Sequence, residues 1–341
     1  MSKDQTTMLK GIAILMMLFL HLFSNPSFAD TTTPLLWIGE IPFATVFTRA
    51  CNPVGFFLVC TGYGLAYSHL HSKLSYKYQL KRVIKLYLNY WLVLSIFVGI
   101  GSIFIPEYYP GSLRMIIENY TGWNTDGYNH PAWFLLPYSV LCLTSPLIFR
   151  FVDKTGMTVS IIVSFILTFA SMYIISRYIA PANAHHEWYS FIFTYFDLLF
   201  AFIIGGFVCY KNEVGRIGID HLRKHQYKVY LLLFLWFITM CFINTSALGP
   251  LFLCLFILLF VHLKIGGICR KVLLELGKKS MVMWLVHAFI YGRFFHHFIY
   301  GFNYPLLIFL SLVLSSYMVS ILIMYLSGLT IGKIGWLNRK S

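Results

Sequence analysis

The sequence predicts an all-α, polytopic membrane protein with about ten transmembrane helices and with both termini in the cytoplasm. Its 341 residues are 58% hydrophobic and 11% charged, with a mean hydropathy of +0.72, which is far too apolar for a soluble globular chain of this length. Apolar stretches of ~20 residues, the length that crosses a bilayer, recur from one end of the chain to the other. Lys and Arg gather in alternate breaks between these stretches, which is typical of membrane proteins with a fixed orientation.

Only short polar segments separate the predicted spans, so we expect one transmembrane domain over residues 1–341 and no separate soluble domain. The ten predicted spans cover residues 8–24, 46–68, 86–105, 131–149, 157–179, 188–210, 228–244, 247–263, 281–299 and 305–328.

The distribution of basic residues sets the predicted orientation. With a cytoplasmic N-terminus, 22 of the 26 Lys and Arg fall in inner segments, as the positive-inside rule requires. The four that remain outside are Arg49, Arg114, Arg177 and Arg293. The formal net charge of +14 is spread between apolar runs and forms no basic arm or stripe, so we expect membrane lipid as a partner and no nucleic acid.

The seven cysteines lie mostly within apolar runs and show no metal-ligand spacing. They are typical of small buried hydrophobic residues and predict no disulfide framework. We also expect no metal.

The first predicted span holds an ionisable side chain within an otherwise apolar run. Lys10 begins this run and His21 lies eleven residues later, so on a helix they share one face, ~16 Å apart along the axis. Hydrocarbon penalises polar side chains, and a histidine retained there indicates a functional site. A signal peptide is the alternative, because residues 27–29 resemble a small-x-small cleavage site. Cleavage there would remove His21.

Two further segments hold candidate binding residues. Thr61 and Gly62 lie in a run of small residues that lets a ligand or a second helix approach the backbone, although helix packing alone is the simpler explanation for any single glycine. Arg82 and Lys85 are three residues apart at the inner end of the third span, so on a helix they can hold a phosphate between them. Basic residues at such a position also serve as anchors at the membrane surface.

Two later histidines also fall within apolar stretches, His262 near the end of the eighth span and His287 about two turns into the ninth. A lone intramembrane histidine is commonly a hydrogen-bonded packing residue. We apply that interpretation to His262 and leave both roles open for His287.

These motifs, in this order, resemble those of the integral-membrane acyltransferase-3 family. Its members carry a basic residue, ten intervening residues and a histidine on the first span, as Lys10 and His21 do here. The basic residue is usually arginine in the family, so Lys10 keeps the charge but loses the bidentate fork. The resemblance extends to four later segments: Phe56–Tyr63 with Thr61 in place of serine, Arg82–Lys85, Trp133–Leu135 and Gly277–His287.

The resemblance implies an O-acyltransferase, in a bacterial cytoplasmic membrane, that moves an acetyl group from acetyl-CoA to a hydroxyl of a surface polysaccharide or lipid-linked sugar. The donor arrives from the cytoplasm with its phosphates, and cations at inner helix ends suit them. His21 then acts as general base on the acceptor hydroxyl or carries the acyl group as an acyl-histidine. The expected donor-binding residues are Lys10, Thr61, Gly62, Arg82 and Lys85, and the expected substrate contacts are Trp133 and His287.

Asp197 is a second predicted catalytic residue, inferred from depth alone. It lies about nine residues from the outer end of the sixth span, ~14 Å deep and close to the predicted depth of His21. A carboxylate in lipid needs a partner, and a structural bond to Arg49 or to a tyrosine hydroxyl explains Asp197 equally well. Outer-loop residues of the kinds that bind sugars form a candidate acceptor cleft: Trp123, Asp126, Tyr128, His130, His185, His186 and Glu187.

A transporter or flippase of a small molecule or lipid-linked glycan is the alternative function. Such proteins show internal repeats and spans broken by Gly and Pro in corresponding halves, and neither pattern is clear in this sequence. A structural or assembly protein is a third class, but it leaves the shared face of Lys10 and His21 unexplained.

Overall fold

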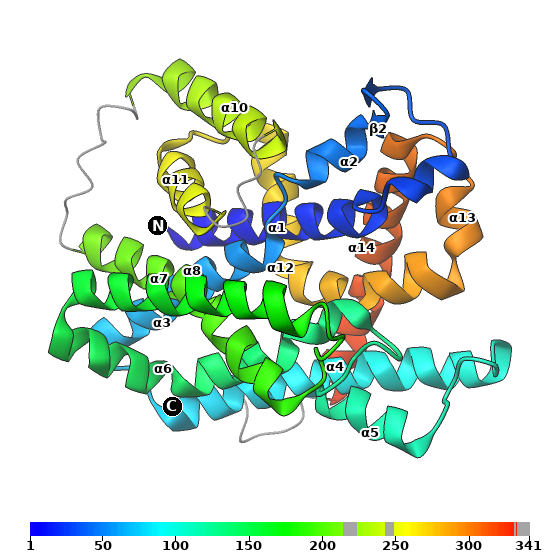
Figure 1. Cartoon of the computed structure of the whole chain (residues 1–341), viewed down its shortest axis with the longest axis horizontal. Coiled ribbons are helices and arrows are strands. Elements are labelled where there is room, and N and C mark those ends of the chain that lie inside the picture. The colour runs from blue at the N-terminus through cyan, green and yellow to red at the C-terminus, as the bar shows by residue number, and fades with distance from the viewer. Residues whose placement is uncertain (214–223, 243–248, 331, 333–341) are drawn as a thin grey trace.

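The computed structural model describes residues 1–213, 224–242, 249–330 and 332 as a bundle of helices with one short β-ladder (Figure 1). In chain order the elements are α1 (Lys3–Phe23), η1 (Pro26–Asp30), β1 (Trp37–Ile38), β2 (Ile41–Pro42), α2 (Phe43–Thr48), α3 (Pro53–Leu70), α4 (Tyr76–Phe104), α5 (Leu113–Thr121), η2 (His130–Phe134), α6 (Leu135–Thr155), α7 (Met157–Ile174), η3 (Ile175–Ile179), α8 (Trp188–Glu213), α10 (Gln226–Phe242), α11 (Gly249–His262), α12 (Gly267–Phe289), η5 (Ile290–Phe294), α13 (His296–Tyr300) and α14 (Pro305–Thr330). Strands β1 and β2 pair antiparallel, with Trp37 opposite Pro42.

The all-α prediction is confirmed, and seven of the predicted spans match helices long and apolar enough to cross a membrane. Their bounds are Lys3–Phe23, Phe43–Leu70, Tyr76–Phe104, His130–Thr155, Met157–Ile179, Trp188–Lys211 and Pro305–Thr330.

The count of ten spans is not confirmed. Helices α10 and α11 have 17 and 14 residues, fewer than the ~20 that cross the hydrocarbon core. Helix α12 begins well before the predicted span 281–299, and its first half is charged. A single turn of π-helix, η5, then ends the helix within the predicted span. Hydropathy alone therefore misplaced this helix, because it follows apolar runs and does not register backbone breaks.

Local signals in the sequence fix where the helices of the candidate site begin. Ser2 and Gln5 form a reciprocal capping box at the start of α1, which satisfies two backbone N–H groups that the first turn leaves free. Asn52 caps α3 ahead of Pro53, and Ser75 caps α4. These caps place Lys10, Thr61 and Arg82 at fixed distances from their helix starts.

Helix α1 packs between α12 and α3 and buries a full stripe of apolar side chains, among them Leu9, Ile14 and Leu18 at 0% exposure. Glycines allow the contact with α12. A Cβ added at Gly11 would lie 2.3 Å from the Leu273 carbonyl oxygen, and one at Gly277 would lie 1.9 Å from that of Thr7. Because α1 packs on both α12 and α3, its removal as a signal peptide would expose the apolar faces of these two helices.

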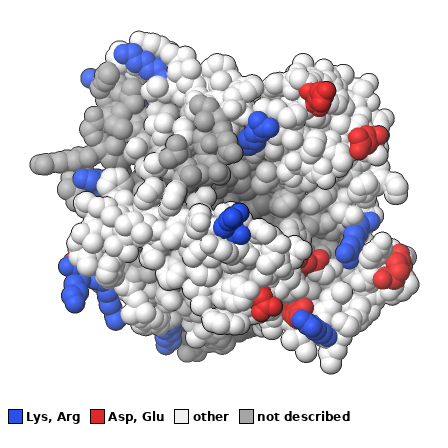
Figure 2. All heavy atoms as spheres, viewed as in Figure 1, with Lys and Arg blue, Asp and Glu red and all other residues white. Residues whose placement is uncertain are grey.

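The charged residues are distributed unevenly over the molecule. In Figure 2, several Lys and Arg mark the side where the N-terminus lies, whereas Asp and Glu gather toward the opposite side. The inner location of the N-terminus stays a prediction, and the predicted cytoplasmic C-terminus concerns residues 333–341, which lie outside the described residues.

Candidate active site

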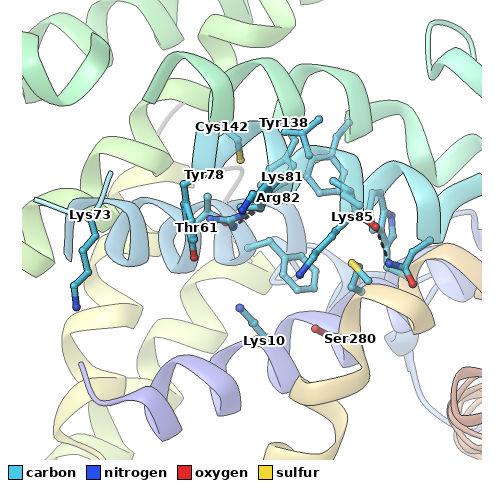
Figure 3. A pocket seen from close by; sticks show the side chains of 17 residues that line it. Lys10, Thr61, Lys73, Tyr78, Lys81, Arg82, Lys85, Tyr138, Cys142 and Ser280 are labelled. Carbon is cyan, nitrogen blue, oxygen red and sulfur yellow. Dashed lines mark hydrogen bonds between the residues drawn. The ribbon is translucent and has the colours of Figure 1, made fainter. Parts of the chain in front are cut away.

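A cavity of about 770 Å³ opens between α1, α3, α4, α6 and α12 (Figure 3). Its volume falls within the range of sites that bind cofactor-sized ligands. Five of its lining residues are basic, and none is acidic. The lining residues are Lys10, Phe57, Thr61, Lys73, Tyr78, Lys81, Arg82, Val83, Lys85, Leu86, Asn89, Phe134, Tyr138, Cys142, Ser280, Met281 and Trp284.

Arg82 is held at the cavity wall by two hydroxyl groups from neighbouring helices. Its Nη2 donates to the Tyr138 hydroxyl over 2.7 Å and to Thr61 Oγ1 over 3.4 Å, and the two hydroxyls lie 3.1 Å apart. Helices α3, α4 and α6 thus meet at one guanidinium. Because both partners are neutral, they orient Arg82 without cancelling its charge.

Lys10 and Lys85 project into the same space from α1 and α4 (Figure 3). Over the described residues, neither side chain forms an ion pair with a carboxylate. The acidic residues near the start of α12 pair with other cations: Asp4 with Arg270, and Glu275 with Lys278 and Lys279. Among the described residues, Lys10 and Lys85 thus add positive charge to the cavity without a paired carboxylate, which suits a ligand with several phosphates.

A pair of histidines lies beyond the cavity, where α1 and α12 run side by side. The ring centroids of His21 and His287 are 5.1 Å apart, and the Tyr291 ring stacks near both, at 6.4 and 5.9 Å. His21 is partly exposed, whereas His287 is fully buried. The Nδ1–H of His287 donates to the Trp284 carbonyl oxygen over 2.7 Å, and within the described part of the chain its Nε2 has no hydrogen-bond partner.

Trp284 connects the cavity to the histidine pair. On α12 the lining residues are Ser280, Met281 and Trp284, so the cavity stops one helical turn, ~5 Å, short of His287. The Trp284 ring packs against that of Phe134 at 4.7 Å, and its indole N–H donates to the Pro131 carbonyl oxygen over 3.0 Å. The cationic cavity and the two imidazoles are therefore adjacent sites, with the Trp284 and Phe134 rings between them.

A cluster of loop side chains lies close to the turn of α12 that precedes the histidine pair. Asp126 bonds His130 Nδ1 at 2.5 Å and lies 3.2 Å from His186 Nε2, which joins the loop after α5 to the loop before α8. The hydrogen bond from His130 holds the pKa of Asp126 below its usual value. Asn129 donates to the Leu285 carbonyl oxygen over 2.8 Å, so this loop is tied to the turn of α12 that precedes His287.

The predicted acceptor cleft is thus brought together only in part. Trp123 is 45% exposed and its ring stacks at 6.3 Å on that of Phe191, close in sequence to the His186 loop. Tyr128, in contrast, is buried and donates its hydroxyl to the Pro110 carbonyl oxygen. Trp133 is 39% exposed and does not line the cavity, whereas its neighbour Phe134 does.

Two predicted site residues lie elsewhere. Gly62 faces α8, where an added Cβ would lie 1.9 Å from the Phe202 carbonyl oxygen, so helix packing accounts for it and Thr61 alone reaches the cavity. Asp197 lies on α8, which packs mainly on α3 and α7. Its side chain has no hydrogen bond or ion pair with His21, both residues being among those described, and its catalytic role stays a prediction.

Sequence reasoning missed Tyr138, which orients Arg82. A tyrosine hydroxyl in an apolar helix has no spacing that marks it, because its partner lies on another helix. Lys73 and Lys81 were predicted only as inner cations, and the structure adds them to the cavity lining.

The chain as a whole agrees with the resemblance that its motifs indicate. The sequence model of the acyltransferase-3 family, described as an acyltransferase domain, matches residues 7–326. The chain therefore belongs to this family, and it is a membrane acyltransferase. No curated protein and no solved structure gives a significant match to it.

Proposed function

We propose that this protein transfers an acetyl group from cytoplasmic acetyl-CoA to a hydroxyl of a surface polysaccharide or lipid-linked sugar, in a bacterial cytoplasmic membrane. The observation that carries the proposal is the adjacency of two sites. A cationic cavity without acidic lining residues stops one turn of α12 short of a histidine pair.

The cavity supports a donor with several phosphates. Arg82, held by the hydroxyls of Thr61 and Tyr138, presents a fixed fork of donors, and guanidinium groups bind phosphate in that geometry. Lys10 and Lys85 add mobile point charges from the facing helices. The apolar residues toward Trp284 and Phe134 suit the uncharged thioester arm of the donor.

His21 supports the transfer step. Its ring lies at the end of α1, on the face that also carries Lys10, and none of its nitrogens is hydrogen-bonded within the described part of the chain. A neutral imidazole so placed can take the hydroxyl proton or accept the acyl group itself. The partly exposed ring lies next to the outer-loop cluster of Asp126, His130 and His186, where a sugar can arrive.

The proposal is tested by deleting the gene and comparing the O-acetyl content of each surface glycan by proton NMR, with complementation by variants. We expect the wild-type chain to restore the acetyl ester and His21→Ala to leave it absent. His262→Ala is the control for loss of an imidazole: its ring is buried and bonded to the Leu258 carbonyl oxygen on α11, and it does not line the cavity. Unchanged glycans after deletion, or full acetylation by His21→Ala, would contradict the proposal.

A further inference from the structure

His287 combines burial with an unused proton acceptor. The residue has 0% exposure, yet its Nε2 has no hydrogen-bond partner among the residues that the structure describes. Leaving a buried polar atom unpaired destabilises the fold, and such atoms call for a specific explanation. Packing alone does not supply one, because an apolar ring would fill the same space without that cost.

The bond to Trp284 fixes the tautomer of His287. A carbonyl oxygen only accepts hydrogen bonds, so the hydrogen of the neutral ring is on Nδ1, which lies 2.7 Å from that oxygen. Nε2 then holds a lone pair. His287 therefore offers a base in a fixed orientation beside His21, whose ring centroid is 5.1 Å away.

A second base has a chemical purpose once an acyl group is on His21. Acylation withdraws electron density from the His21 ring, so its remaining nitrogen becomes a weak base. The acceptor hydroxyl must still lose a proton as it attacks. A second imidazole next to the first meets this need, because general bases work best when they lie within hydrogen-bond reach of the proton.

We propose that His21 carries the acyl group and that His287 Nε2 is the general base that deprotonates the acceptor hydroxyl. This inference rests on the proposed function. In the first half-reaction the unprotonated nitrogen of His21 bonds the carbonyl carbon, the C–S bond breaks, and the thiolate takes the proton from the other nitrogen of His21.

In the second half-reaction the hydroxyl oxygen bonds the carbonyl carbon and gives its proton to His287 Nε2. The C–N bond breaks and its electron pair returns to His21. His287 then passes the proton to His21, which restores both neutral rings. The short separation of the two rings serves this last transfer.

The test separates the two half-reactions in the purified full chain. Acetyl-CoA is added without acceptor, and thiol release and acetylation of His21 are measured by thiol titration and mass spectrometry. Unacetylated glycan from the deletion strain is then added, or hydroxylamine, a nucleophile strong enough to discharge an acyl-imidazole without a base. His287→Gln and His287→Phe are compared with His262→Gln, and thermal unfolding checks that each variant is folded.

We expect both His287 variants to keep the thiol burst within about 2-fold of wild type and to be discharged normally by hydroxylamine. Their discharge by glycan should fall by ~10²- to 10⁴-fold, the usual contribution of a general base, while His262→Gln behaves as wild type. Normal discharge by glycan in His287→Gln, or loss of the burst in a folded variant, would overturn the inference.

The wild-type protein distinguishes failure of the inference from failure of the proposed function. Turnover with glycan but without acetyl-His21 would leave the acyltransferase standing and overturn the two-histidine pathway. If the wild-type protein shows no thiol release and no glycan acetylation, the proposed function is contradicted, and the inference with it.

Discussion

The side chain of Arg82 contributes its charge to the cavity, because the two groups that hold it are neutral hydroxyls. Arg82 is bonded to two hydroxyls and to no carboxylate among the described residues, so its full charge faces the cavity. The sequence predicted Lys10, Thr61, Arg82 and Lys85 at this site, and all four line the cavity. It did not predict Tyr138, because a hydroxyl that pairs across helices leaves no pattern along the chain.

At this scale we predict that Arg82→Gln raises KM for acetyl-CoA by roughly 10- to 100-fold, since a hydrogen bond to a charged group contributes about 1.5–3 kcal/mol. Tyr138→Phe removes only the hydroxyl that orients Arg82 and should raise KM less, by about 3- to 10-fold. Steady-state kinetics of the purified protein with varied acetyl-CoA measures both.

Lys77→Gln provides the control for loss of a positive charge. Lys77 is exposed on the first turn of α4, the helix that carries Arg82, and does not line the cavity. The KM of the Lys77→Gln variant for acetyl-CoA should match that of the wild-type protein. An equal rise of KM in Lys77→Gln would mean that Arg82 acts only through overall charge, contrary to the geometry of the site.

At the scale of elements, the pairing of α1 with α12 creates the site. The eleven-residue spacing on the first span predicted that Lys10 and His21 share a face. In the structure Lys10 lines the cavity, to which α12 also contributes, and His21 lies beside His287 of α12. The partner of that face was not predictable. It begins more than 240 residues later in the chain, and its first half has the charge pattern of a surface helix, which hydropathy assigns to a loop.

The contact between these helices depends on Gly277, where an added Cβ would lie 1.9 Å from the Thr7 carbonyl oxygen. Since backbone atoms cannot yield as a flexible side chain does, we predict that Gly277→Ala pushes the helices apart. Overpacking typically costs about 1–3 kcal/mol, so the apparent Tm in detergent should fall. Acetyl transfer should fall with it, because Lys10 and His21 move relative to Trp284 and His287.

Gly99→Ala is the matched substitution in α4, where nothing lies within 4 Å of the added Cβ. Alanine is favoured over glycine inside a helix by about 0.5–1 kcal/mol, so this variant should be as stable as wild type or more so. If Gly277→Ala behaves like Gly99→Ala in both Tm and activity, close contact of α1 and α12 is not needed for the site.

For the molecule as a whole, the sites follow one another along its length. The cations of the cavity lie toward the start of α1, the histidine pair lies at its end, and the Asp126 cluster lies in the loops beyond. In the proposed function, this order lets a phosphorylated donor and a sugar acceptor approach from opposite sides of the membrane. This order works only if the start of α1 faces the cytoplasm, where acetyl-CoA is made.

Cys269 reports that orientation, because it is the exposed cysteine among the seven and lies at the start of α12, near the N-terminal end of α1. We predict that a membrane-impermeant maleimide labels Cys269 in inverted vesicles and not in intact cells, and that the label is lost in Cys269→Ser. Glu107→Cys, in the exposed loop between α4 and α5, should show the reverse pattern in the Cys269→Ser chain. A cavity that binds phosphates must open on the side where the phosphorylated substrate is found. Labelling of Cys269 in intact cells would therefore contradict the proposal, because it would place the cationic cavity on the outer side, out of reach of its proposed donor.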